Sequence, residues 1–154
     1  MYEFFKTNEN FAQMSDEDKQ IFAEHCTIKK VAKDEVLFKD GEHGDDVYIV
    51  KEGIIRISKK IRDDEVITLA LSKAGMIFGE MAIFESILRY ADAAALTNAE
   101  LIVFDKKSFQ HIREIHPKTA LVIVDMIIRF LGFYLRKTTD RVYGIFLDKN
   151  QQEN

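Results

Sequence analysis

Two short runs of residues offer binding chemistry in this sequence: Gly79-Glu80-Met81-Ala82 and, after a gap, Arg89-Tyr90-Ala91. A glycine allows the backbone to come close to a ligand. A short helix that begins near Glu80 would direct its free N–H groups at an anion. Arg89 could add a charge-assisted fork of hydrogen bonds to phosphate oxygens. The two runs therefore predict a site for a phosphate group.

Glu80 extends this prediction from a phosphate to a nucleotide. A carboxylate is a poor partner for a phosphate, but it is a good acceptor for a ribose hydroxyl. A sugar acceptor beside an anion site is what a nucleoside monophosphate requires. The alternative, an ordinary turn with a surface ion pair between Glu80 and Arg89, is compatible with the same residues.

The composition indicates one small globular domain. The chain has 154 residues, of which 47% are hydrophobic and 31% are charged, enough for a modest core and too apolar for a disordered chain. The formal net charge is −4. An acidic balance disfavours a nucleic-acid groove as the main surface, so we expect no nucleic-acid partner within this chain.

The cellular compartment is predicted from the cysteine content and from the apolar runs of the sequence. Cys26 is the one cysteine, so an internal disulfide is impossible, which fits a reducing compartment. The N-terminus turns polar at once and lacks the apolar run of a signal peptide. The longest apolar run is too short to span a bilayer. These features predict a cytoplasmic protein without a membrane partner.

Short strands between helices are expected from the hydrophobic periodicity. Ser15 is placed to cap a helix from Asp16 to about His25, and the period changes to two from Thr27 onward. Glycine and aspartate turns separate the apolar runs, a pattern typical of a β-roll or jelly roll. The predicted strands are Thr27–Val31, Val36–Phe38, Val47–Val50, Ile54–Ser58, Val66–Leu71, Ala91–Ala95 and Leu101–Phe104.

Two helices are expected after the last strand. Asp105 could cap a helix over Lys106–Ile115, and Pro117 suits the first position of a long final helix. That helix carries apolar residues at alternating spacings of four and three, which predicts a homodimer through the same helix of a second subunit; alternatively, they cover the barrel of their own subunit. The seam consists of Val124, Ile128, Leu131, Leu135, Thr138, Val142 and Ile145.

A second run of residues strengthens the nucleotide interpretation and carries a family resemblance. Residues 37–53, Leu37-Phe38-Lys39-Asp40-Gly41-Glu42-His43-Gly44-Asp45-Asp46-Val47-Tyr48-Ile49-Val50-Lys51-Glu52-Gly53, place a strand, a glycine turn, an apolar strand and a closing glycine in order. Together with residues 78–95, this stretch resembles the cyclic nucleotide-binding domain family, in its catabolite activator protein-like and cAMP-dependent kinase regulatory subunit-like branches. The resemblance extends from about Ser15 to Leu147.

The resemblance implies a mainly β fold with flanking helices. The core would be an eight-stranded β-roll, jelly-roll-like and of the cupin type, with N-terminal helices and a long C-terminal helix. The implied domain occupies residues 1–147, with the roll at about 26–105 and the C-terminal helices at about 106–147. Residues 148–154 would form a polar tail.

Roles for individual residues follow from the resemblance alone. It implies that Gly79 contributes backbone, that Glu80 accepts the ribose 2′-hydroxyl and that Arg89 pairs with the cyclic phosphate. Met81 and Ala82 correspond to backbone N–H donors. In the catabolite activator protein branch two neighbouring hydroxyl residues reach the adenine amino group, one from each subunit. Thr138 and Thr139 match those positions, which favours cAMP over cGMP; they could also be polar members of the helical seam.

Tyr90 departs from the family pattern, in which the residue after the phosphate arginine is Ser, Thr, Ala or Gln. Its ring could stack on a purine, turn outward or block the pocket. If it blocks the pocket, the alternative is a degenerate dimerisation and scaffold module without ligand.

No enzyme, metal centre or cofactor is expected. The sequence shows no nucleophile with a base and an orienting group. His25 and Cys26 are adjacent, which is not a metal-ligand spacing.

We therefore expect a sensor in which a cyclic nucleotide, cAMP or possibly cGMP, closes the segment 79–91 and repositions the final helix. Seven residues follow Leu147, too few for a helix-turn-helix. This leaves a stand-alone sensor or the ligand-binding half of a truncated transcription regulator.

Overall fold

The strands form two antiparallel sheets in the computed structural model, which describes residues 1–62, 65–84 and 88–152, with side chains described as far as Gly144. One sheet has the order β1-β8-β3-β6 and the other the order β2-β7-β4-β5. The strands are β1 Thr27–Val31, β2 Val36–Phe38, β3 Asp46–Glu52, β4 Ile55–Arg62, β5 Glu65–Ser72, β6 Ile77–Phe78, β7 Asp92–Ala95 and β8 Ala99–Asp105.

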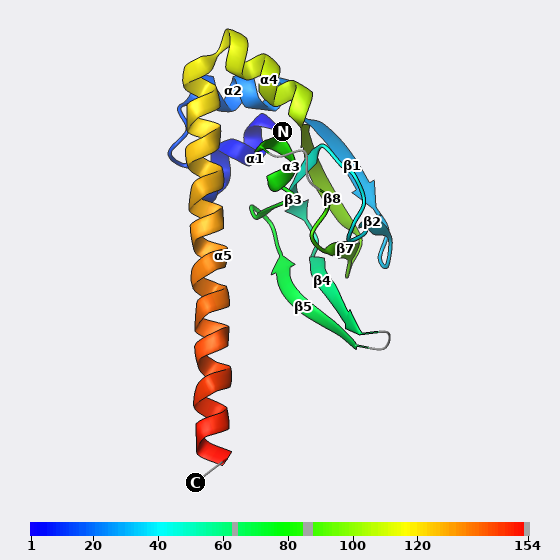
Figure 1. The fold of residues 1–154 in the computed structure, drawn as a ribbon. Coiled ribbons are helices and arrows are strands. Elements are labelled where there is room, and N and C mark those ends of the chain that lie inside the picture. Colours follow the sequence, from blue (N-terminus) through cyan, green and yellow to red (C-terminus); the bar gives the residue numbers. More distant parts are fainter. Residues whose placement is uncertain (63–64, 85–87, 153–154) are drawn as a thin grey trace.

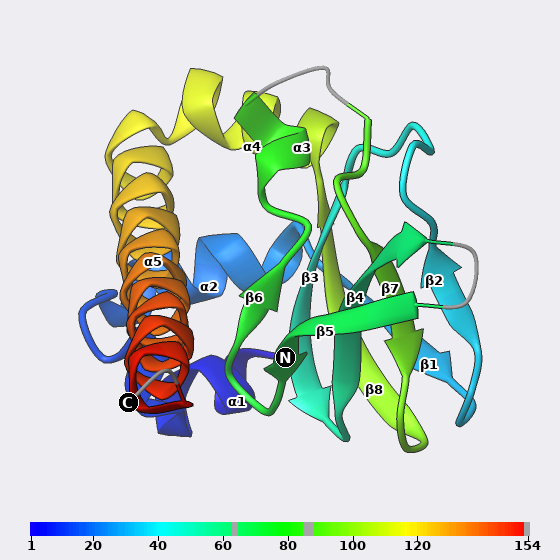
Figure 2. The ribbon, with the colours of Figure 1, turned by 60° about the horizontal axis from the view of Figure 1, so that its bottom comes forward.

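Helices flank the sheets at both ends of the chain, which confirms the predicted fold class. Figure 1 shows α5 running beside the sheets, and Figure 2 looks nearly along its axis. The helices are α1 Tyr2–Thr7, the 3-10 helix η1 Glu9–Phe11, α2 Asp16–Glu24, α3 Met81–Phe84, α4 Lys106–Ile115 and α5 Pro117–Gln152.

Strand β3 holds the molecule together because both of its faces are buried. Val47 and Ile49 pack toward the helices, whereas Tyr48 and Val50 pack toward the second sheet. A strand buried on both faces requires a continuous apolar run in place of an alternating one. The run Val47-Tyr48-Ile49-Val50 therefore fixes β3 as the layer shared by two cores.

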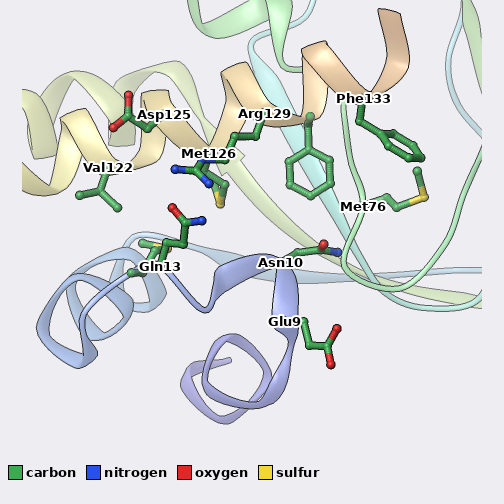
Figure 3. A pocket seen from close by; sticks show the side chains of 11 residues that line it. Glu9, Asn10, Gln13, Met76, Val122, Asp125, Met126, Arg129 and Phe133 are labelled. Carbon is green, nitrogen blue, oxygen red and sulfur yellow. The ribbon is translucent and has the colours of Figure 1, made fainter. Parts of the chain in front are cut away.

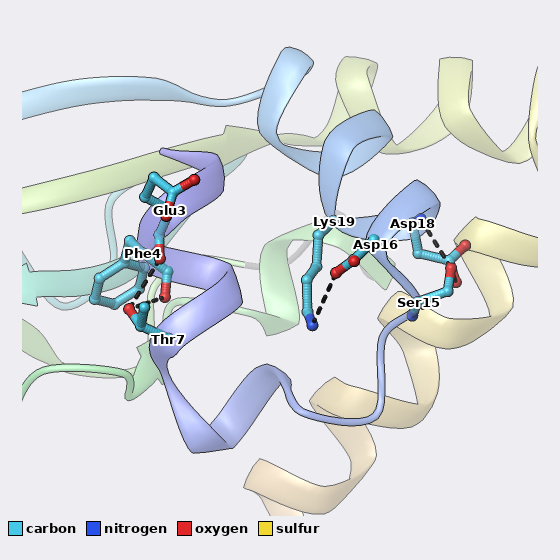
Figure 4. A network of polar contacts seen from close by, with 7 residues as sticks. All are labelled: Glu3, Phe4, Thr7, Ser15, Asp16, Asp18 and Lys19. Atoms are coloured by element: carbon cyan, nitrogen blue, oxygen red, sulfur yellow. Dashed lines mark hydrogen bonds and ion pairs between the residues drawn. The ribbon is translucent and has the colours of Figure 1, made fainter.

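The N-terminal helices are fixed by capping and by one bond to α5. Ser15 caps α2, as the sequence predicted, and the structure adds a reciprocal bond from Asp18 that completes a capping box (Figure 4). The Thr119 hydroxyl donates to the Asp18 carboxylate at 2.7 Å, which ties α2 to the first turn of α5. The aromatic core beneath these helices includes Phe5, Phe22 and Phe104, each at most 2% exposed.

The bounds of β3, β4, β5, β7 and β8 differ from the sequence prediction by one to four residues, and larger differences occur at β6 and at the end of α5. Strand β6 was not predicted, because Ile77–Phe78 is only two residues long and has no period to detect; β3 pairs with it at Tyr48 and Ile49. Helix α5 continues past Leu147, where a polar tail was expected, to Gln152. Residues 148–152 contain no glycine or proline, so nothing local ends the helix.

Other predicted features of the C-terminal helices agree with the structure. The Asp105 side chain accepts a hydrogen bond from the Ser108 N–H and caps α4, and Pro117 opens α5. Among the described helices, none is both long and apolar enough to cross a membrane.

Candidate functional site

A cavity of about 460 Å³ lies between the second sheet, the α3 segment and α5. Its size is that of a small-molecule site. The strands contribute Phe38, Ile57, Leu69, Ala70, Ser72 and Phe78, and α5 contributes Leu131, Tyr134 and Thr138. The remaining wall comes from the segments that the sequence singled out: Gly79, Glu80, Met81, Ala82, Leu88, Arg89, Tyr90 and Ala91.

The structure thus brings all but one of the predicted site residues to a single cavity. Thr138 lines it from α5. Thr139 does not, and its hydroxyl donates to the Leu135 carbonyl one turn back along the helix at 2.9 Å. Within one chain, the two threonines therefore point to different surroundings.

Arg89 is the polar centre of the cavity wall and is only 8% exposed. One terminal nitrogen, Nη1, donates to the Gly79 carbonyl at 3.2 Å, and the other, Nη2, donates to the Asp46 carbonyl at 2.8 Å. The guanidinium lies over the Phe38 ring, 4.2 Å from its centroid. Within the described residues, Nε is buried with no hydrogen-bond acceptor. A buried donor without an acceptor is costly, so this nitrogen is suited to a ligand oxygen.

Two glycines make room for the guanidinium. A Cβ on Gly44 would lie 2.6 Å from both Nε and Nη2 of Arg89, and a Cβ on Gly79 would lie 2.8 Å from Nη1. Gly79 also has a positive φ of 76°, which other residues rarely adopt. Any side chain at Gly44 would therefore displace the guanidinium.

The turn after β2 holds the Arg89 backbone. The Gly41 N–H donates to the Arg89 carbonyl, and the Arg89 N–H donates to the Glu42 carbonyl, both at 2.8 Å. Residues 37–53, the second run noted in the sequence, therefore hold the backbone of Arg89 in place. The sequence analysis did not predict that Gly44 and Asp46 contact the arginine. The glycines close to Asp45 and Asp46 in this turn were the feature that could have indicated it.

Burial lowers the pKa of Arg89 below its usual value, while the nearby Tyr48, Asp46, Asp45 and Glu80 act in the opposite direction. Burial and the charge of Asp46 also raise the pKa of the Tyr48 phenol to about 12. The Arg89 guanidinium in the cavity wall is therefore bonded to backbone carbonyls, and it forms no ion pair with a carboxylate of the described residues.

Glu80 lines the same cavity and is half-buried. Burial raises the pKa of its carboxyl group, and its own backbone N–H and the charge of Arg89 only partly oppose this shift. No other described residue donates a hydrogen bond to its carboxylate. The Glu80 carboxylate can therefore still accept a hydrogen bond from a hydroxyl group.

The Tyr90 ring turns outward, which is one of the three orientations that the sequence left open. Its side chain is 75% exposed. Lys59 holds it there, with Nζ 3.7 Å from the ring centroid and 2.7 Å from the Tyr90 carbonyl; the Asp40 carboxylate pairs with the same ammonium at 3.2 Å. The ring lies at the rim and does not fill the cavity.

Two polar contacts that the sequence did not reveal hold α5 against the roll. The Tyr134 hydroxyl donates to the Ile77 carbonyl at 2.9 Å. Arg141 donates to the carbonyls of Leu69 and Thr68 at 2.7 and 3.1 Å, on the free edge of β5. The helix therefore closes one side of the cavity through directional bonds as well as apolar packing.

The predicted helical seam divides into two rows. Ile128, Leu135 and Val142 are 57%, 69% and 47% exposed, and Leu121, one heptad earlier, is 62% exposed. The other row turns inward: Val124 and Leu131 are half-buried against the helical core, and Thr138 faces the cavity. The side chain of Ile145 lies outside the described residues. The exposed row is apolar, and its own chain does not cover it.

Comparison with protein families gives a match over more than half of the chain. The model described as the cyclic nucleotide-binding domain matches residues 28–116. No cluster of three or more His, Cys, Asp or Glu side chains that could hold a metal ion occurs in the described part of the chain.

Two of the curated relatives are regulatory proteins longer than this chain. It is similar to the anaerobic regulatory protein of Bacillus subtilis, with 27% identity over 79% of this chain and 50% of the relative. The CRP-like cAMP-activated global transcriptional regulator of Mycobacterium tuberculosis is 26% identical over 73% of this chain and 49% of the relative. The chain therefore spans about half the length of these relatives.

Solved structures share the fold. A cyclic nucleotide-binding domain from Methylobacillus flagellatus KT superposes with a TM-score of 0.83 at 21% identity, covering 93% of this chain and 80% of that one.

Replacing Glu80 with Gln is expected to stabilise the protein at neutral pH. A carboxyl whose pKa is raised by folding costs stability once it ionises, so the free energy of unfolding falls as the pH rises from the usual value of 4.5 through the raised value. The urea midpoint of Glu80→Gln should exceed that of the wild type at pH 7, and the difference should shrink toward pH 4.5. Glu114→Gln, which removes an exposed carboxylate from α4, is the control; an equal pH-dependent gain in both variants would contradict the assignment.

Proposed function

Because this chain belongs to the cyclic nucleotide-binding domain family, we propose that it is a sensor whose cavity binds a cyclic nucleotide, with cAMP as the preferred ligand. The family relation supports nucleotide binding, and the geometry of the cavity supports particular contacts. The role is regulatory, not catalytic, and the ligand changes the disposition of α5.

The observation that carries the proposal is Arg89. Its guanidinium is buried in the cavity wall, held in place by the carbonyls of Gly79 and Asp46, and its Nε has no acceptor among the described residues. The exocyclic oxygens of a cyclic phosphate would accept from this nitrogen and from a terminal nitrogen, as charge-assisted pairs do. Met81 and Ala82, at the start of α3, line the cavity beside it.

Glu80 would accept the ribose 2′-hydroxyl. Its carboxylate lies in the same wall as Arg89 and has no described partner outside its own backbone. A hydroxyl donor would replace the water that burial removes and would stabilise the ionised form. The two residues together would read the sugar and the phosphate of one ligand.

Thr138 supports adenine as the base. Its position on α5 places it at the cavity together with Leu131 and Tyr134, so a purine there would lie against the helix. Thr139 faces away within the chain. In a parallel pair of α5 helices it would come from the second subunit.

A change at the nucleotide would reach α5 through Tyr134. Its hydroxyl is bonded to the Ile77 carbonyl, two residues ahead of Gly79. Movement of the segment 79–91 around the phosphate would shift this bond and the helix with it. A ligand that prefers one of two such arrangements shifts their populations.

The exposed heptad row supports a homodimer. Leu121, Ile128, Leu135 and Val142 repeat every seven residues and are exposed on α5; they would supply one of the two apolar rows of a two-helix coiled coil.

Arg89→Ala is expected to weaken cAMP binding by roughly ten- to a hundredfold, because hydrogen bonds to a charged group contribute about 1.5–3 kcal/mol. Calorimetric titration, with cGMP in parallel, measures the effect. Wild-type protein free of copurified nucleotide should bind about one cAMP per chain and bind cGMP more weakly. Arg113→Gln, which removes an exposed cation from α4, should bind normally. Unchanged affinity in a folded Arg89→Ala protein would rule out the phosphate contact, and no binding of either nucleotide to the wild type would rule out the sensor.

The Glu80 contact is tested with 2′-deoxy-cAMP. The wild type should prefer cAMP over the deoxy ligand, since only cAMP donates a 2′-hydroxyl to the carboxylate. In Glu80→Gln the preference should shrink, because the hydrogen bond loses its charge. Titration of both proteins with both ligands gives the coupling, and an identical preference in the two proteins would argue against this contact.

Leu135→Glu should convert the dimer to a monomer, because it places a charge in the apolar seam. Sedimentation equilibrium measures the mass. Tyr143→Glu adds the same charge at an exposed position beside the heptad row and should remain dimeric. A monomeric wild type, or a dimeric Leu135→Glu variant, would refute dimerisation through this row.

A further inference from the structure

A second cavity, of about 480 Å³, lies on another face of α5, against η1 and the segment that follows it (Figure 3). Met14, Met126 and Phe130 form its base and are at most 9% exposed. Met76 and Phe133 extend the apolar wall. Methionine side chains are flexible and polarisable, so they adapt to apolar ligands of varied shape.

Hydrogen-bond donors gather at the mouth of this cavity. Arg129 and Gln13 point toward one another in Figure 3, and no described residue forms an ion pair or hydrogen bond with either side chain. Asn10 also lines the cavity, but its amide donates to the Gly75 carbonyl at 3.2 Å and is directed away from Arg129 and Gln13 in Figure 3. A guanidinium and one amide therefore lie together beside an apolar space.

Two carboxylates also belong to the rim, but they turn away from this space. In Figure 3 the Asp125 side chain points to the far side of α5 and the Glu9 side chain points away from Arg129. The polar groups directed at the cavity thus include the Arg129 guanidinium, which is positively charged and only donates, and the Gln13 amide, which can donate as well as accept. The complementary ligand has an anionic, planar head and an apolar body.

We propose that this cavity binds a monocarboxylate with an apolar chain, of the medium-chain fatty acid class. The carboxylate accepts from the Arg129 guanidinium and from the Gln13 amide. The chain lies among Met14, Met76 and Met126. Arg129 forks its two donors to the two carboxylate oxygens, a geometry that an alcohol or an amine cannot match.

The site is separate from the nucleotide cavity and does not depend on the proposed function. The two cavities share no lining residue, although α5 forms a wall of both. The cavity also avoids the exposed heptad row, so a dimer through that row leaves it open. A ligand here would contact the same helix that the nucleotide contacts from the other face.

The methionines provide a direct readout. The chain has five; Met14, Met76 and Met126 line this cavity, and Met81 lines the nucleotide cavity. Titrating the full chain, labelled with ¹³C at the methionine methyls, with octanoate should shift the first three signals saturably and leave Met81 in place. Titrating with cAMP should shift Met81, so failure of one site is distinguishable from failure of the other.

Charge recognition is tested with matched ligands and variants. Octan-1-ol and octylammonium, which have the same chain, should bind at least about tenfold more weakly than octanoate. Arg129→Gln should lose about tenfold in octanoate affinity, whereas Arg113→Gln should lose none. Unshifted Met14, Met76 and Met126 signals at millimolar octanoate would overturn the proposal. So would equal affinity for octan-1-ol, or unchanged affinity in Arg129→Gln protein with an undisturbed Met81 signal.

Discussion

The burial of one positive charge is the constraint around which the cavity between the second sheet and α5 is built. Arg89 is almost fully buried, and a buried cation is tolerated only where dipoles or charges surround it. Backbone carbonyls of Gly79 and Asp46 supply those dipoles, and the space exists because Gly44 and Gly79 have no side chain. The conformation of two loops, and with them the ends of β2, β3 and β6, follows from the need to satisfy this guanidinium. Among the described residues, the Arg89 Nε has no acceptor, which is the observation behind the proposed phosphate contact.

Helix α5 contacts the helical core and both cavities, because each of its faces packs against a different part of the molecule. One face packs into the helical core through residues such as Ile123 and Ile127. A second closes the nucleotide cavity, held by Tyr134 and Arg141. A third exposes an apolar heptad row, and a fourth borders the methionine-lined cavity. A rigid helix that contacts several sites can transmit a displacement from one of them to the others, since its backbone hydrogen bonds resist bending. In the proposed sensor, this shared wall would link ligand binding to dimerisation.

Local features of the fold could be predicted from the sequence where a single residue type decides the conformation. Ser15 and Asp105 cap their helices through their own side chains, and Pro117 opens α5, all as expected. Strands β1 and β2 began and ended as predicted. Strand β6 could not be predicted because two residues have no period, and it exists only because β3 offers it a partner. The end of α5 was placed too early because a polar composition was taken as an end, although no helix-breaking residue occurs there.

The sequence by itself determined which residues would form the site and what chemistry they would offer. Glycine, glutamate and arginine at that spacing indicate a phosphate site once the second run, residues 37–53, is considered with them, and the heptad row is a property of one helix. Only the tertiary structure decided how they are arranged. Two of the residues that surround the Arg89 guanidinium, Gly44 and Asp46, lie more than forty residues away along the chain. The Tyr90 ring points outward because Lys59, on another strand, pairs with it. The orientation of a side chain depends on neighbours that folding brings together, and the linear order of residues does not specify those neighbours.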